Sequence, residues 1–155
     1  MIIRLLCIGT KMPGWIQTGY TEFARRLPKD NALELVELPL RKRGSNSVAV
    51  QQQHEEKLLL GKIKPRDLVI ALDESGESWT SDMLAKRMNT WRHSGSNVAL
   101  LVGGPDGLSA VCKNLAIAHW SLSRATLPHA LVRVLVAEQI YRAWSLNANH
   151  PYHRA

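Results

Sequence analysis

Residues 97–107, NVALLVGGPDG, place five apolar side chains directly before a cluster of three glycines and one proline. A short apolar run that stops at turn-forming residues is typical of a β-strand buried in a sheet. Residues 109–118 follow, with Ser109 as a suitable N-cap, and favour a short helix. This stretch therefore predicts a buried strand, a glycine turn and a helix in succession.

The same alternation extends in both directions from this stretch. Apolar runs predict further strands at residues 1–8, 32–38, 67–72 and 120–123. Apolar residues at helical spacing predict helices at residues 15–27, 48–60, 82–93 and 128–146. We therefore expect one α/β domain over residues 1–155, with a mostly parallel sheet covered by helices on both faces. In such sheets, ligands bind beyond the carboxyl ends of the strands, which draws attention to the connections after Gly9, Leu72, Val102 and Ser123.

The composition narrows the class of protein. Of the 155 residues, 45% are hydrophobic and 21% charged, as in ordinary globular domains. The formal net charge of +7 favours a polyanionic partner, either nucleic acid or an acidic membrane surface, although many proteins are basic without such a partner. No apolar run approaches a membrane span, and the apolar N-terminus is too short for a signal peptide, so we expect a cytoplasmic protein. Cys7 and Cys112 form no C-x-x-C pair and are expected to be reduced and half-buried.

The last predicted helix is apolar on two sides. One side carries Leu131, Val134 and Leu135, and another carries Val132, Val136 and Ile140. A helix on the surface of a protein needs only one apolar stripe. This helix is therefore either central in the core or shared with a second subunit. In so short a chain we favour the second interpretation and expect a homodimer.

Two connections between strands and helices are candidates for ligand binding. The first includes Gly103 and Gly104, whose lack of a side chain lets a ligand approach the backbone. It is neither a dinucleotide-binding fingerprint nor a P-loop, and taken alone it is more simply a tight turn. The second consists of Leu122, Ser123, Arg124, Ala125, Thr126 and Leu127. Its small and hydroxyl residues suit an adenine or a ribose, although an ordinary connection is the alternative. The nearby His129 is a possible ligand or base, but a lone histidine in the first turn of a helix more often makes a local hydrogen bond.

Polar residues elsewhere suggest contacts with RNA. The terminal residues 149–154, NHPYHR, combine groups that bind phosphate and stack on bases, although a disordered basic end is the alternative. Its two histidines lack further ligands, so no metal is expected. A cationic set with Trp15 and Tyr20 nearby suits an RNA backbone or a solvated surface: Lys11, Arg25, Arg26, Lys29, Arg41, Lys42 and Arg43. Residues 41–47 read as a flexible basic loop. Asp73 and Glu74 are adjacent, so in a strand they would point to opposite faces and form no acid–base pair.

Taken together, four strings resemble one family, the small SPOUT-class methyltransferases of the RlmH type. They are GTKMPGWIQTGYTEFARRLPKD (9–30), LVGGPDGLS (101–109), WSLSRATLPHALVRVLVAEQIYRAWS (120–145) and NHPYHR (149–154). The resemblance covers essentially the whole chain and is weakest over residues 45–64. It implies a C-terminal trefoil knot, which is an exception to the rule that chains are not knotted. It also implies methylation of N3 of a pseudouridine, at position 1915 of bacterial 23S rRNA, by a homodimer that uses S-adenosylmethionine and acts on the ribosome.

Carried over by position, the resemblance implies cofactor-binding residues at Leu72, Gly103, Gly104 and the stretch 122–127. The predicted cofactor-binding and catalytic residues thus lie within residues 98–154, except for Leu72, which precedes this region. Methyl transfer to a ring nitrogen requires alignment of the two reacting centres and loss of the N3 proton. We expect the tail of one subunit to reach the cofactor pocket of the other. Tyr152, His153 and Arg154 would hold the target nucleotide there, supported by Arg142.

Two alternatives stay open at this point. A non-catalytic basic RNA-binding module explains the charge and the aromatic residues, but it does not explain why both candidate connections follow strands. A nucleotide-dependent α/β enzyme such as a dehydrogenase lacks the glycine fingerprint that such enzymes carry. Binding of S-adenosylmethionine would separate the methyltransferase from the RNA-binding module.

Overall fold

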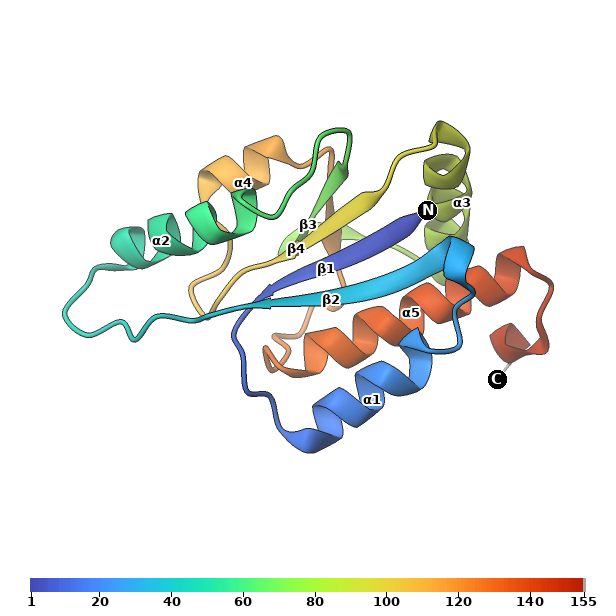
Figure 1. Cartoon of the computed structure of the whole chain (residues 1–155), viewed down its shortest axis with the longest axis horizontal. Helices are drawn as coiled ribbons and strands as arrows, with labels where there is room; N and C mark the ends of the chain where they lie inside the picture. The colour runs from blue at the N-terminus through green and yellow to red at the C-terminus, as the bar shows by residue number, and fades with distance from the viewer. Residues whose placement is uncertain (155) are drawn as a thin grey trace.

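The computed structural model describes residues 1–154 and has one parallel β-sheet at its centre (Figure 1). Its strands are β1 (Ile2–Ile8), β2 (Ala32–Leu38), β3 (Leu68–Ser78), β4 (Val98–Val102) and β5 (Ala118–Ser121). They lie in the order β2-β1-β4-β3-β5, and every neighbouring pair is parallel. The prediction of a mostly parallel sheet is confirmed.

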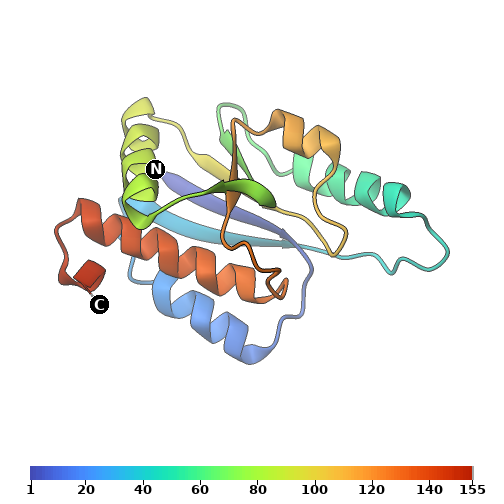
Figure 2. The same cartoon turned by 180° about the vertical axis from the view of Figure 1, so that it is seen from behind.

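Helices cover both faces of the sheet, as Figures 1 and 2 show from opposite sides. One face carries α1 (Gly14–Ala24), α3 (Ser81–Ser94) and α5 (Leu131–Asn147); the other carries α2 (Val48–Leu60) and α4 (Ala110–Leu115). The alternating side chains of β1 supply both cores, since Leu5 packs with the first set of helices and Leu6 with the second. Burial on both faces explains why the strands read as continuous apolar runs.

Several element boundaries differ from the sequence prediction. β3 continues beyond residue 72 to Ser78, because its pairing with β5 shifts: Trp120 pairs first with Leu72 and then with Glu77. α4 ends at Leu115 rather than at residue 118, because Ala118 already pairs with Ile70 in the sheet and begins β5. α1 ends at Ala24 and not at residue 27, and α5 begins at Leu131, three residues after Pro128. The connection before α5 is therefore longer than expected.

α5 occupies the central position on its face of the sheet, where it packs against both α1 and α3. Its Val136, Ala137 and Ile140 are completely buried. This central position accounts for the apolar residues on more than one side of the helix, which was one of the two interpretations of its sequence. Pairing with a second subunit stays a prediction, as does the trefoil knot.

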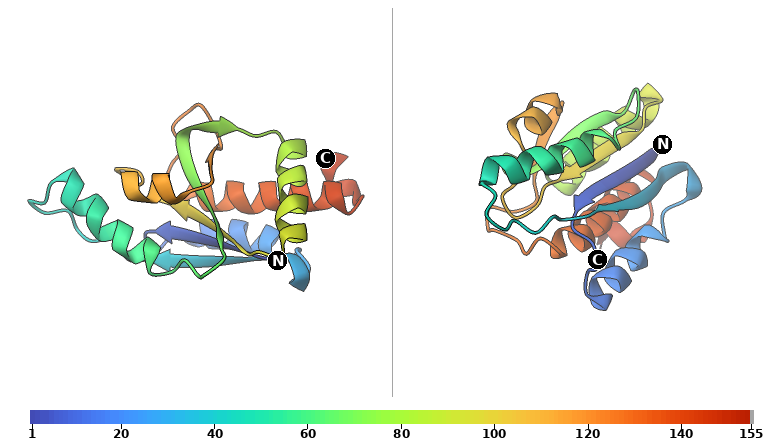
Figure 3. Two further views of the ribbon diagram at one scale, coloured as in Figure 1. Left: turned by 90° about the horizontal axis from the view of Figure 1, so that it is seen from above. Right: turned by 60° about the vertical axis from the view of Figure 1, so that its left-hand side comes forward.

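Both cysteines are free and completely buried, so the expectation of half-buried thiols is wrong. Burial raises the pKa of the Cys7 thiol to about 12. Within residues 1–154, no helix combines the length and the apolar character that crossing a membrane requires. The N-terminus and residues 151–154 lie at one end of the molecule, whereas α2 and the connection before it extend from the opposite end (Figure 3).

Candidate functional site

A cavity of about 560 Å³ opens at the carboxyl ends of the central strands. Three predicted connections meet in it, namely those after Leu72, after Val102 and after β5. Of the predicted cofactor residues, those that line the cavity are Leu72, Gly103, Gly104, Leu122, Ser123, Ala125, Thr126 and Leu127. Arg124 is exposed and lies outside the lining. The rule that parallel sheets bind ligands beyond their strand ends thus located this cavity from the sequence.

The connection of residues 103–107, hereafter the glycine loop, forms one wall of the cavity. A Cβ on Gly103 would lie 2.6 Å from the backbone carbon of Gly107, so no other residue fits there without moving the backbone. The loop closes through a hydrogen bond from the Gly107 N–H to the Gly104 carbonyl, and Gly107 has a φ of +78°. These glycines therefore allow a tight turn, as the sequence predicts. This turn forms part of the cavity wall.

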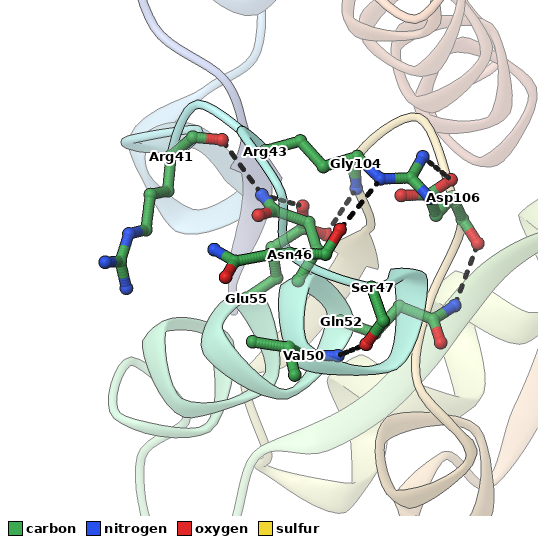
Figure 4. Close-up of polar contacts among 10 residues, drawn as sticks. Arg41, Arg43, Asn46, Ser47, Val50, Gln52, Glu55, Gly104 and Asp106 are labelled. Atoms are coloured by element: carbon green, nitrogen blue, oxygen red, sulfur yellow. Dashed lines mark hydrogen bonds and ion pairs between the residues drawn. The ribbon is translucent and has the colours of Figure 1, made fainter.

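α2 holds the glycine loop from outside the cavity (Figure 4). The Glu55 side chain is buried, and its carboxylate accepts hydrogen bonds from the Gly104 N–H at 3.1 Å and from the Gln51 amide at 3.2 Å. The Gln52 amide donates to the Asp106 carbonyl at 2.8 Å. Sequence reasoning missed these contacts, since polar residues on a helix give no local sign of a partner some 50 residues away.

Charged side chains form a second wall of the cavity. Asp73 and Glu74 both line it, and their side chains contact different segments: Asp73 pairs with Lys113 of α4, and Glu74 accepts from the Thr126 hydroxyl at 3.4 Å. Lys113 lies 2.8 Å from the Asp73 carboxylate. Burial acts to raise the pKa of Asp73, but hydrogen bonds from Lys113 and Ser75 outweigh it and lower the pKa. Charges of both signs therefore face the same cavity.

The start of α5 is fixed to the ends of the first two strands. Arg133 is completely buried and donates to the Gly9 carbonyl at 2.9 Å. Its Nε lies 3.3 Å from the Glu37 carboxylate, without the geometry of a hydrogen bond. His129, which lines the cavity, contacts the Ile8 carbonyl through Nε2. Burial lowers the pKa of His129. Its partner is 121 residues away in the chain, so the expected local hydrogen bond is replaced by a long-range one.

The sequence of this chain is similar to those of known methyltransferases. A family model described as "Predicted SPOUT methyltransferase" matches residues 1–153. This chain belongs to the SPOUT methyltransferase family. The ribosomal RNA large subunit methyltransferase H of Marinomonas sp. (strain MWYL1) is 53% identical to it over 155 residues, which are 99% of this chain and 100% of that protein.

A more distant structure shares the fold of this SPOUT chain. It is that of a probable methylase family protein from Haemophilus influenzae Rd KW20, which superposes with a TM-score of 0.58 at 15% sequence identity. The match covers 96% of this chain and 69% of that chain. At such low identity the likeness concerns the fold alone.

The predicted tail residues of this SPOUT chain lie away from the cavity. The tail forms a short 3-10 helix, η2 (Pro151–Arg154), beside the C-terminal end of α5. None of its residues lines the cavity, although the Tyr152 hydroxyl reaches Glu138, six residues or about 9 Å along α5 from Val132 on the cavity wall. Within one chain, Tyr152, His153 and Arg154 therefore do not join the predicted cofactor residues.

The tail nevertheless makes defined contacts in this SPOUT chain. The Tyr152 hydroxyl donates to Glu138 at 3.1 Å, and Arg142 binds the same carboxylate at 2.7 Å while its guanidinium lies 5.1 Å from the centre of the Tyr152 ring. Arg142 and Tyr152 thus lie together, as expected. Burial, aided by the Glu138 carboxylate, raises the pKa of the Tyr152 hydroxyl. Within residues 1–154, no cluster of three or more candidate ligands could hold a metal ion.

Proposed function

We propose that this chain is an S-adenosylmethionine-dependent methyltransferase that modifies N3 of a pseudouridine in the 23S rRNA of the large ribosomal subunit. Membership of the SPOUT methyltransferase family and the name of the relative that is 53% identical support this proposal. The observation that carries it is the cavity in which the glycine loop, the residues after Leu72 and the stretch 122–127 converge. We infer further that the protein acts in the cytoplasm, on the ribosome, as a homodimer.

The residues that line the cavity fit this cofactor. Its volume of about 560 Å³ lies within the usual range for cofactor sites. S-adenosylmethionine joins a zwitterionic amino acid, through a sulfonium, to an adenosine whose adenine ring has apolar faces. Lys113 and Asp73 offer the two opposite charges, and apolar walls are supplied by Leu72, Val102, Leu122 and Val132. When bound, the cofactor supplies an electrophilic methyl group on a sulfonium.

The protein's own contribution is to hold and orient. Backbone groups of the glycine loop and of residues 122–127 would fix the cofactor, since both segments line the cavity. The contacts of Arg133 and His129 with the end of β1 keep the second segment in place. Such alignment of two reacting centres is a large part of catalysis when no metal takes part.

The target nucleotide would be held by the tail of a second subunit. Within one chain the tail packs beside α5, and none of its residues lines the cavity. An antiparallel arrangement of two α5 helices would bring each tail to the other subunit's cavity. Tyr152, His153 and Arg154 are then available to the nucleotide, with Arg142 supporting Tyr152 from the side.

Mass spectrometry of large-subunit rRNA from cells that lack this protein tests the substrate. The N3 methyl group should disappear from the pseudouridine and return with the wild-type gene; its retention in the deletion strain would remove the assignment. Calorimetric titration with S-adenosylmethionine tests the cofactor independently. A protein that binds rRNA but not this cofactor would instead be a non-catalytic RNA-binding module.

Truncation tests the tail. Deletion of residues 150–155 should abolish methylation and leave cofactor binding nearly intact. Because His150 and Tyr152 pack against Tyr141, the deletion also exposes an aromatic surface. Arg154→Ala, at an exposed position, is the matched point variant that loses no packing. Full activity of both variants would contradict the role of the tail.

A further inference from the structure

The connection between β2 and α2 presents three consecutive cations beside the cavity. We call residues 39–47, PLRKRGSNS, the basic arm. Arg41, Lys42 and Arg43 are all exposed, and the arm reaches beyond the end of the sheet (Figures 1 and 3). It lies at the carboxyl end of β2, which is the same end of the sheet as the cavity.

The basic arm, which the sequence predicts to be a flexible loop, contacts both the glycine loop and α2. The Arg43 guanidinium lies 3.5 Å from the Asp106 carboxylate, and Asp106 lines the cavity. The Gln51 amide donates to the Arg41 carbonyl at 3.0 Å, and the Asn46 N–H donates to the Arg43 carbonyl at 2.9 Å. Figure 4 shows how these contacts join the arm, α2 and the glycine loop.

The three cations of the basic arm differ in their partners. Arg43 is engaged by Asp106, whereas the side chains of Arg41 and Lys42 have no ion-pair partner within residues 1–154. In Figure 4 the Arg41 side chain points away from the glycine loop and from α2. Arg41 and Lys42 thus lie within about 8 Å, along the backbone, of Arg43. Arg43 in turn pairs with Asp106 on the cavity wall.

Among the other cations of the set seen in the sequence, Lys11 follows β1 at the same end of the sheet as the basic arm, whereas three lie elsewhere. Lys29, Arg25 and Arg26 lie at the amino end of β2, about 20 Å from the arm along this strand. Arg25 and Arg26 both pair with Glu22. The cationic set of the sequence therefore divides into two groups at opposite ends of the sheet. The basic arm belongs to the group at the end where the cavity lies.

We propose that Arg41 and Lys42 bind phosphates of the rRNA next to the target nucleotide, while Arg43 keeps the arm seated on the glycine loop. This inference rests on the proposed function. Contacts with phosphates fix the register and orientation of a nucleic acid without reading its sequence. Arg41 and Lys42 would therefore hold the RNA equally in the ground state and in the transition state, without touching the reacting atoms.

The test is binding of the full-length protein to ribosomes from cells that lack it, measured at several salt concentrations between about 50 and 200 mM. Arg41→Ala/Lys42→Ala should reduce the slope of log K against log salt by about 1.4 to 1.8, which is 0.7 to 0.9 for each lost phosphate contact. At 0.1 M salt this corresponds to an affinity about 25- to 60-fold weaker. In methylation assays the KM for ribosomes should rise while kcat stays unchanged.

Lys86→Ala/Arg92→Ala is the matched control, because it removes two exposed charges from α3, on the other face of the sheet. It should leave the salt slope and the affinity close to those of the wild type. Both double variants should bind S-adenosylmethionine as the wild type does, in calorimetry, and should keep its melting temperature.

The outcomes separate this inference from the proposed function. If the wild type neither binds nor methylates ribosomes, the proposed function fails. If it does both and the arm variant keeps the wild-type slope, or loses no more affinity than the control, the inference about the arm alone is overturned. Loss of binding to vesicles of anionic lipid, with binding to ribosomes unchanged, would likewise overturn it in favour of a membrane surface.

Discussion

Glu55→Gln should destabilise the protein, because a carboxylate with two buried acceptors becomes an amide with one. If the new amide oxygen faces the Gly104 N–H, its NH₂ group faces the Gln51 NH₂. Gln51 must then turn its own amide and give up its bond to the Arg41 carbonyl. If the NH₂ group faces Gly104 instead, that buried N–H loses its acceptor.

The expected loss follows from these bonds. One neutral hydrogen bond contributes about 1 kcal/mol, and replacing a charged acceptor with a neutral one costs about 1 kcal/mol more. The free energy of unfolding should therefore fall by about 2 kcal/mol, which lowers the melting temperature of a protein of this size by about 4–8 °C.

Urea denaturation of Glu55→Gln and of Glu56→Gln measures this difference. Glu56 is the next residue of α2 and is only half-buried, so its variant should stay within about 0.5 kcal/mol of the wild type. The reasoning is refuted if both variants unfold with the same free energy. If Glu55→Gln loses more cofactor affinity than Glu56→Gln does, the substitution has also displaced the glycine loop.

Three further predictions concern buried groups. Arg133→Met should lower the free energy of unfolding in urea by about 3 kcal/mol, since it leaves Glu37 unpaired; a loss below 1 kcal/mol would count against this. Because burial lowers the pKa of folded His129 below 6.5, wild-type stability should fall as the pH drops below about 6.5, and His129→Gln should flatten that slope. Cys7, whose pKa burial raises to about 12, should resist thiol reagents at pH 8 until the protein unfolds; rapid labelling of the native protein would contradict its burial.

Local patterns were enough to predict the strands and the position of the cavity. Each apolar run became a strand buried on both faces, and the rule for parallel sheets brought Leu72, Gly103 and residues 122–127 together. The resemblance to a family added the identity of the cofactor, which spacing alone does not specify.

The contributions of Asp73, Glu74 and Glu55 were not predictable from local patterns. Asp73 and Glu74 find their partners, Lys113 and Thr126, 40 and 52 residues further along the chain. The role of Glu55 depends on Gly104, 49 residues away, and a contact at that separation exists only once the sheet has formed. Residues 116–118 continue an apolar pattern, but pairing with β3 takes precedence over the helix there.

The position of the tail, away from the cavity of its own chain, has a consequence for how activity would be shared between subunits. If a tail that does not line its own cavity serves the cavity of a neighbour, each catalytic unit would combine parts of two polypeptides. A chain with a spoiled cavity and a chain without its tail would each be inactive alone. Mixed and allowed to exchange, half of the dimers would pair one of each, with one complete centre out of two, and about a quarter of full activity would return. Two separately inactive variants would thus complement one another in solution.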